Sequence, residues 1–163
     1  TAGMETIKCH WNSVLSTKGA KYCTGDISNM YLCLWLKDYE YVRFSIDLIP
    51  PRIIEQYQLQ KLVHGSYVYA KIKRAWYGLK QSGKIVHNDL VAHLQTHGYV
   101  RTPRTEDLFV YKTRDVSFTL AVDDFGIKYT KQADVDHLIA AVREKYPFKV
   151  DWEAKQYIGI HLI

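Results

Sequence analysis

Three aspartates have the residue type and the surroundings that phosphoryl-transfer chemistry needs. Asp26 ends a predicted strand, and Asp123 and Asp124 fill a predicted two-residue hairpin turn between an apolar run and a second strand. Neighbouring ionised carboxylates repel each other, and burying them without a partner is costly. Mg²⁺ offsets that cost, since it prefers oxygen ligands and is often held by carboxylates and substrate phosphates. Two such ions about 4 Å apart activate an attacking hydroxyl and stabilise the leaving oxygen. An Asp-Asp pair taken alone is more often an ordinary turn.

The excess positive charge is confined to one stretch of the chain. Residues 1–60 and 101–163 each hold equal numbers of basic and acidic residues, so the net charge of +5 arises within residues 61–100. The basic residues there are Lys61, Lys71, Lys73, Arg74, Lys80 and Lys84. They are interleaved with tyrosine and tryptophan, a pattern that suits a polyanion backbone with base stacking. A solvated basic face above aromatic core residues explains the same composition.

The rest of the composition narrows the class of protein. The chain has 163 residues, 47% of them hydrophobic, which favours one cored domain. The three cysteines Cys9, Cys23 and Cys33 are odd in number and unpatterned, which argues against a disulfide framework or a zinc site. Reduced, mostly buried thiols of a cytosolic or nuclear protein are expected instead. No apolar run is long enough for a membrane span, and Thr1–Lys21 lacks the pattern of a signal peptide.

Strands and helices alternate along the sequence in a pattern typical of an α+β fold. Helices are predicted from Pro51 to about Tyr57, over Ser82–His97 and over Ala133–Tyr146, with Ser82 as a cap and Gly98 as a stop. The predicted strands are Lys21–Ile27, Tyr41–Ile46, Tyr67–Ile72, Asp107–Thr113, Val116–Val122, Phe125–Tyr129, Phe148–Trp152 and Lys155–Ile163. We therefore expect an antiparallel sheet packed on two long helices, with a ferredoxin-like or RRM-like core.

Four short motifs occur in an informative order. They are Asp26-Ile-Ser-Asn-Met-Tyr31, Trp76-Tyr-Gly-Leu-Lys-Gln-Ser82, Ala121-Val-Asp-Asp124 and Tyr157-Ile-Gly-Ile160. Their order and spacing resemble the Ty1/copia family of retrotransposon reverse transcriptases, from about Tyr22 to Ile163. The runs Tyr77–Gln81 and Val122–Asp124 are the specific parts of the resemblance. It implies a polymerase palm with partial fingers over residues 1–163, without thumb, ribonuclease H or integrase.

The resemblance implies roles at the matching positions. Asp26, Asp123 and Asp124 would be the catalytic residues and would bind two Mg²⁺ ions, for which Mn²⁺ can substitute. Tyr31 would be the steric gate against ribonucleotides, and Gln81 would contact the incoming nucleotide and the template. A core ring at Tyr31 and capping of the following helix by Gln81 are the alternatives.

Further positions would contact nucleic acid. The basic candidates, expected near phosphates, are Lys73, Arg74, Lys80 and Lys84. Tyr157 and Gly159 would belong to the primer-grip hairpin, with a core strand as the alternative. Lys149 and Lys155 are both candidates for the lysine that protonates the leaving pyrophosphate.

The expected activity is RNA-directed DNA polymerisation. Its partners would be an RNA or DNA template-primer and deoxynucleoside triphosphates, with no membrane, in the cytoplasm or nucleus or in a retroelement particle. Two alternatives stay open: a catalytically silent or domesticated nucleic-acid-binding remnant, and another enzyme on a palm-like fold, such as a nucleotidyl cyclase, which would need no template.

Overall fold

The chain forms two compact units in a computed structural model that describes residues 1–162. Unit 1 comprises Thr1–Met30 together with the chain from Gly83 onward, and unit 2 comprises Tyr31–Ser82. The short 3₁₀ helix η1 (Met30–Cys33) begins at the first boundary, and α3 (Ser82–Thr96) begins at the second. The sequence predicts one domain, a palm with partial fingers, over these residues.

Unit 1 is built on a six-stranded sheet with the order β4-β5-β6-β7-β1-β8, and all neighbouring strands are antiparallel. The strands are β1 (Lys21–Ile27), β4 (Tyr99–Arg101), β5 (Leu108–Tyr111), β6 (Val116–Ala121), β7 (Asp124–Tyr129) and β8 (Phe148–Asp151). With α3 after β1 and α4 (Gln132–Arg143) after β7, the chain order β1-α3-β6-β7-α4-β8 is that of a ferredoxin-like α+β fold. The fold class expected from the sequence is thus confirmed.

One face of this sheet packs on α3 and α4. Helical spacing places the buried side chains Val86, Leu90 and Leu94 on one stripe of α3. The helices are joined by a hydrogen bond between the His93 ring Nε2 and the carbonyl oxygen of Ala141, 2.7 Å apart. On the sheet, the rings of Phe109, Phe118, Phe125 and Phe148 follow one another at centroid distances of 5.0–5.2 Å. This aromatic row forms the centre of the core.

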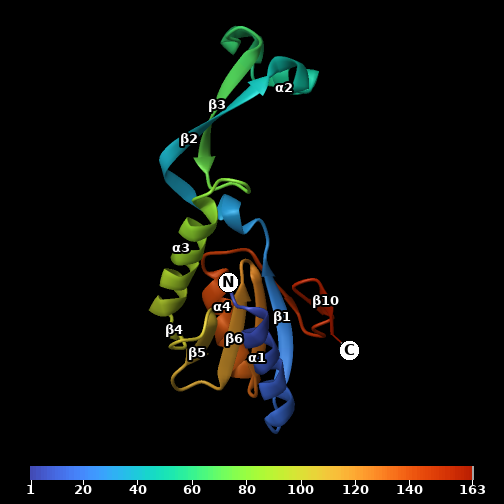
Figure 1. The fold of residues 1–163 in the computed structure, drawn as a ribbon, viewed down its shortest axis with the longest axis vertical. Coiled ribbons are helices and arrows are strands. Elements are labelled where there is room, and N and C mark those ends of the chain that lie inside the picture. The colour runs from blue at the N-terminus through green and yellow to red at the C-terminus, as the bar shows by residue number, and fades with distance from the viewer. Residues whose placement is uncertain (163) are drawn as a thin grey trace. The chain divides into compact units, whose positions relative to one another are not determined.

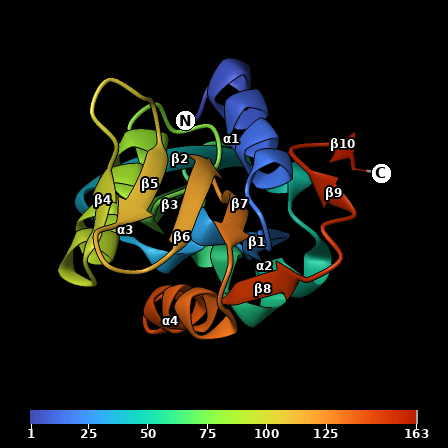
Figure 2. The same ribbon diagram turned by 90° about the horizontal axis from the view of Figure 1, so that it is seen from below.

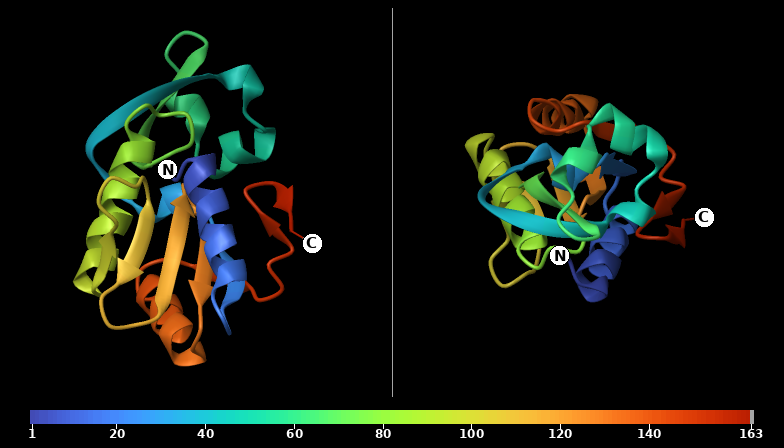
Figure 3. Two further views of the ribbon diagram at one scale, coloured as in Figure 1. Left: turned by 60° about the horizontal axis from the view of Figure 1, so that its bottom comes forward. Right: turned by 90° about the horizontal axis from the view of Figure 1, so that it is seen from above.

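The opposite face of the sheet carries α1 (Met4–Ser16), which the sequence analysis did not predict. Figure 2 shows α1 and α4 on opposite sides of the sheet. A terminal hairpin of β9 (Gln156–Tyr157) and β10 (Ile160–His161) lies beside α1 (Figure 3). Ile7 and Tyr157 are buried together there, with Trp11 packed against them. Lys155–Ile163, expected as a single strand, is therefore a tight hairpin over its described part, and Ile163 lies outside the described residues.

Unit 2 is a two-stranded antiparallel ribbon with short helices (Figure 1). Its strands are β2 (Trp35–Ser45) and β3 (Tyr67–Arg74), both longer than predicted. Between them lie η2 (Ile46–Leu48), α2 (Pro51–Gln56) and η3 (Leu59–Leu62). Pro51 begins α2, as expected, because the first helical turn does not need the missing donor. No helix in residues 1–162 is long and apolar enough to cross a membrane.

Candidate active site

The pairing of β1 with β7 brings the predicted catalytic carboxylates together. Asp26 is the direct cross-strand partner of Asp124, and Asp123 immediately precedes Asp124. Directly opposed residues of an antiparallel pair project on the same face of the sheet, with Cβ atoms about 5 Å apart. The main chain is tied at this point by a hydrogen bond from the Ile27 amide to the Asp123 carbonyl oxygen, at 3.1 Å. Residues about a hundred positions apart in sequence thus form one acidic site.

The turn that carries Asp123 differs by one residue from the predicted turn. Ala121 pairs with Asp124, so the two turn residues are Val122 and Asp123, while Asp124 is the first residue of β7. Val122 has a φ of +60°, a conformation that is costly for a β-branched residue. Hairpin turns with a positive φ at the first central position normally use glycine, asparagine or aspartate there. The site therefore sits on a strained turn.

The electrostatic environment disfavours ionisation of two of the carboxyl groups. Burial raises the pKa of Asp124 above its usual value, and the charges of Asp123 and Asp26 raise it further. Burial and the Asp26 charge likewise raise the pKa of Asp123, against the effect of its own backbone hydrogen bond. Within residues 1–162, none of the three carboxylates has an ion-pair partner. No ion pair in this part of the chain therefore offsets their negative charge.

The donor set fits a hard divalent cation only in part. Carboxylate oxygens are the ligands that Mg²⁺ prefers, and a cation would relieve the repulsion that raises the two pKa values. Across the described part of the chain, however, no three His, Cys, Asp or Glu side chains are gathered closely enough to hold a metal ion. The side chains of Asp26, Asp123 and Asp124 would have to rotate toward one another to share an ion.

A cavity of about 240 Å³ opens beside Asp26 and Asp124. It is also lined by Thr24, Gly25, Lys149, Val150, Asp151 and Gln156. Lys149 is the cross-strand partner of Asp26 on β8, so the backbone of this lysine lies on the other side of Asp26 from Asp124. Lys155 instead pairs with Glu153, with Nζ and Oε2 2.6 Å apart. Of the two lysines left open by the sequence, Lys149 is the one beside the carboxylates.

The predicted nucleotide-binding residues lie in unit 2, whereas the carboxylates lie in unit 1. The ring of Tyr31 contacts that of Tyr77, with centroids 4.3 Å apart and planes tilted by 45°. The side-chain amide of Gln81 donates a hydrogen bond to Glu40 Oε1 at 2.7 Å, which joins Gln81 to β2. Ser82 was predicted to cap α3. Its hydroxyl accepts a hydrogen bond from the backbone amide of Trp76, which precedes the helix, at 3.1 Å.

The predicted nucleic-acid-binding residues have different surroundings. Lys73, Arg74 and Lys80 are exposed in unit 2, and Lys84 is exposed in unit 1. Tyr157 is only 2% exposed, and its hydroxyl bonds the Thr119 hydroxyl at 3.0 Å. Its side chain therefore anchors the terminal hairpin, and a contact with nucleic acid would have to come from the exposed turn around Gly159, whose φ is +79°.

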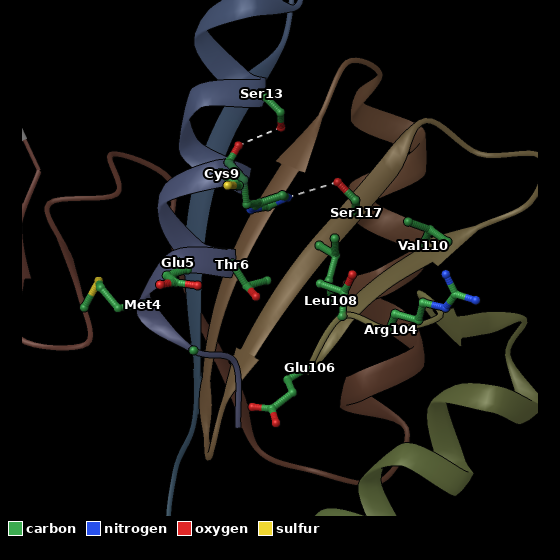
Figure 4. A pocket seen from close by; sticks show the side chains of 13 residues that line it. Met4, Glu5, Thr6, Cys9, Ser13, Arg104, Glu106, Leu108, Val110 and Ser117 are labelled. Carbon is green, nitrogen blue, oxygen red and sulfur yellow. Dashed lines mark hydrogen bonds between the residues drawn. The ribbon is translucent and has the colours of Figure 1, made fainter.

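A larger cavity, of about 820 Å³, lies on the same sheet face between α1 and the strands β5 and β6 (Figure 4). The His10 ring, which lines it, bonds the Ser117 hydroxyl with Nε2 and Oγ 3.0 Å apart. Burial and the nearby Lys128 charge lower the pKa of His10 to about 4. None of the three carboxylates lines this cavity, so its size does not make it the reactive centre.

Comparisons with known proteins support the fold. The chain matches no protein-family profile and no curated protein. It is similar in structure to a chain in the structure of telomerase from Candida albicans in complex with the TWJ fragment of telomeric RNA, with a TM-score of 0.51 and 15% sequence identity. The match covers 96% of this chain and 32% of that chain, so this chain spans about a third of its length. At this identity the likeness concerns the fold alone.

Proposed function

We propose that this chain is the palm region, with part of the fingers, of a Ty1/copia-type reverse transcriptase, and that it extends a primer 3′-hydroxyl on an RNA template. The observation that carries the proposal is the cross-strand pair Asp26–Asp124 with Asp123 in the adjoining turn, on a ferredoxin-like sheet. The fold likeness to a telomerase that was solved with an RNA fragment is consistent with a polynucleotide partner.

The carboxylates would hold Mg²⁺, or Mn²⁺ in its place. A bound divalent ion supplies charge neutralisation to the triphosphate and acidifies the attacking hydroxyl. Asp123 and Asp124, whose pKa values are raised, would release any bound proton as the cation arrives. Lys149, across from Asp26, would offer a proton and a positive charge to the leaving pyrophosphate. Tyr31 would exclude a ribose 2′-hydroxyl, and Gln81 would have to exchange its bond to Glu40 for the nucleotide.

Primer extension tests this proposal. We expect the purified chain to extend a DNA primer on an RNA template with Mg²⁺ or Mn²⁺, and Asp123→Asn or Asp124→Asn to abolish extension. Asp136→Asn is the matched control, because Asp136 is an exposed aspartate of the same unit whose oxygen accepts from Gln132 and would still do so as an amide. Extension that survives in the Asp124→Asn variant would refute the proposed role of the carboxylates. Turnover of a nucleoside triphosphate without primer would favour a cyclase-like enzyme.

A catalytically silent nucleic-acid-binding remnant is the second candidate. The separation of the three carboxylate side chains favours it, since no three-ligand set is assembled in residues 1–162. This candidate predicts polynucleotide binding that is equal in the wild type and in Asp124→Asn, with no extension by either. Stabilisation of the wild type by Mg²⁺ that is lost in Asp124→Asn would count against it.

A further inference from the structure

One face of the β2–β3 ribbon carries only aromatic, basic and hydroxyl side chains. Side chains alternate between the two faces of a strand, and directly opposed residues share a face. The opposed pairs on this face are Tyr41 with Lys71, Arg43 with Tyr69 and Ser45 with Tyr67. Each of the first two pairs joins one aromatic ring to one cation. We call the exposed residues Tyr41, Arg43, Tyr67, Tyr69 and Lys71 the ribbon face.

The rings of the ribbon face are not part of a core. Tyr41 is 68% exposed and Tyr69 56% exposed, although both are large side chains on strands. The opposite face carries the apolar residues of the ribbon, and Val68 there is buried. The ribbon thus shields its aliphatic side chains and exposes tyrosines to solvent. In a half-buried strand the solvent-facing positions are normally polar.

One cation lies over a ring of the ribbon face, and a second lies over a neighbouring ring. The Arg43 guanidinium lies 4.4 Å from the centroid of the Tyr67 ring, and the Lys71 ammonium lies 3.6 Å from the centroid of the neighbouring Tyr39 ring. Exposed contacts of this kind are weak, so a ligand can displace them. They hold the long basic side chains close to the rings before any ligand binds.

The positive charge of the ribbon face favours a polyanion as its ligand. The paired positions of the face hold Arg43 and Lys71, and Lys73 follows on the same strand. One acid, Asp47, lies at the far end of the face, where it accepts a hydrogen bond from Ser45. Residues two apart on a strand are about 7 Å apart, so rings and cations are offered in a regular series. Rings that stack unpaired bases, beside cations that contact phosphates, are the two components of sites for single-stranded nucleic acid. A duplex would leave the rings unused, because its bases are stacked inside.

We propose that the ribbon face binds single-stranded nucleic acid, with little preference for sequence. The inference is independent of the carboxylate site, since the ribbon lies wholly in unit 2. An anionic membrane is the less suitable partner, because no Leu, Ile, Phe or Trp belongs to this face and its rings alternate with cations.

The test is fluorescence anisotropy of the full chain with a labelled oligothymidylate at several salt concentrations. We expect Tyr41→Ala/Tyr69→Ala to weaken binding about tenfold or more, because each stacked base contributes about tenfold to a hundredfold. The conservative Tyr41→Phe/Tyr69→Phe variant should bind like the wild type. Arg43→Gln/Lys71→Gln should weaken binding and lower the slope of log affinity against log salt by about 0.7 per charge.

The controls come from unit 2 outside the ribbon face. Tyr57 is 60% exposed at the end of α2, and Arg52 is exposed on the same helix, so Tyr57→Ala and Arg52→Gln should leave binding unchanged. Wild-type affinity in the Tyr41→Ala/Tyr69→Ala variant would overturn the proposal. Equal affinity for a blunt duplex, or binding of phosphatidylserine vesicles with no binding of the oligonucleotide, would overturn it as well. Retained binding by Asp124→Asn, with loss of primer extension, would separate this surface from the polymerase site.

Discussion

Asp123 and Asp124 have carboxyl groups whose surroundings in the folded chain disfavour the charged form. Burial and neighbouring charges raise the pKa of both carboxyl groups in the folded chain. A carboxyl with a raised pKa is easier to ionise in the unfolded chain than in the folded one. Its contribution to stability is therefore lost as the pH rises from the ordinary carboxyl pKa, about 3.9, through the folded pKa. At neutral pH each ionised group destabilises the fold.

We predict that Asp124→Asn raises the Tm at pH 7 in the presence of EDTA, because it removes a partly buried charge that is repelled by Asp123 and Asp26. Differential scanning fluorimetry against Asp136→Asn as control measures the effect. Added Mg²⁺ should raise the Tm of the wild type and leave that of Asp124→Asn unchanged. A lower Tm for Asp124→Asn in EDTA would contradict the electrostatic account.

His10 has the opposite kind of perturbation, and it lies outside the carboxylate site. The side chain is 5% exposed, and within residues 1–162 its Nδ1 atom has no hydrogen-bond partner. Burial first, and then the Lys128 charge, lower the pKa of the ring to about 4, although hydrogen bonding at Ser117 acts in the other direction. The unfolded chain, with an ordinary histidine pKa of about 6.5, takes up the proton first.

We predict that His10 destabilises the fold as the pH falls from about 6.5 to about 4, the window in which only the unfolded chain is protonated at this residue. The loss is of the order of 3 kcal/mol over the whole window. Urea unfolding at pH 7 and pH 4.5 measures it, with His10→Gln as the comparison, since glutamine can still bond Ser117 and does not titrate. Equal pH dependence in the two proteins would exclude His10 as the cause.

Strand β1 depends on a glycine next to its catalytic candidate. A Cβ atom placed on Gly25 would lie 2.1–2.9 Å from three atoms of the Phe148 ring. Phe148 packs against Phe125 and ends the aromatic row on the sheet face that packs on α3 and α4. The absence of a side chain at Gly25 therefore lets the ring cover β1 directly behind the acidic site.

We predict that Gly25→Ala destabilises the protein by about 1–3 kcal/mol, the usual cost of overpacking a core. Gly3→Ala is the matched control, because Gly3 has a negative φ and a Cβ atom added there would meet no other atom within 4 Å. Chemical denaturation of both variants gives the free energies of unfolding. A Gly25→Ala variant as stable as Gly3→Ala would mean that Phe148 moves aside without cost.

The two units differ in the means that stabilise them. Unit 1 buries a sheet of six strands between helices, whereas unit 2 has a ribbon of two strands. An isolated two-stranded hairpin is marginally stable in water, because one pair of strands buries little apolar surface. Exposed rings on the ribbon face reduce that burial further.

We predict that amide hydrogens in β1, β6 and β7 exchange slowest and that those in β2 and β3 exchange much faster. Hydrogen-exchange mass spectrometry, corrected for intrinsic rates, compares the peptides. Saturating oligothymidylate should slow exchange in β2 and β3 if the ribbon face binds it. Equal protection of the ribbon and the central strands in the free protein would contradict the difference between the units.

The sequence predicted those features that depend on local patterns. The spacing of apolar residues in α3 and α4, and the proline that begins α2, identified these helices within a few residues. Alternation and turn residues identified β1, β6 and β7, and hence the positions of the three acids at strand ends. The hairpin turn between β6 and β7 lies at Val122 and Asp123, one residue before the predicted turn at Asp123 and Asp124. The sequence did not indicate this position, because Val122 adopts a left-handed conformation that its residue type disfavours.

The features that decide the site depend on pairing between distant segments, which local patterns do not encode. Only the tertiary structure sets Asp26 opposite Asp124 and Lys149, because strand register results from packing of the whole sheet. It likewise buries Tyr157, a residue that motif order alone assigned to nucleic acid. The sequence thus determined the positions of the three acids at the ends of strands. Their neighbours, their raised pKa values and the exposed ribbon face follow from tertiary contacts.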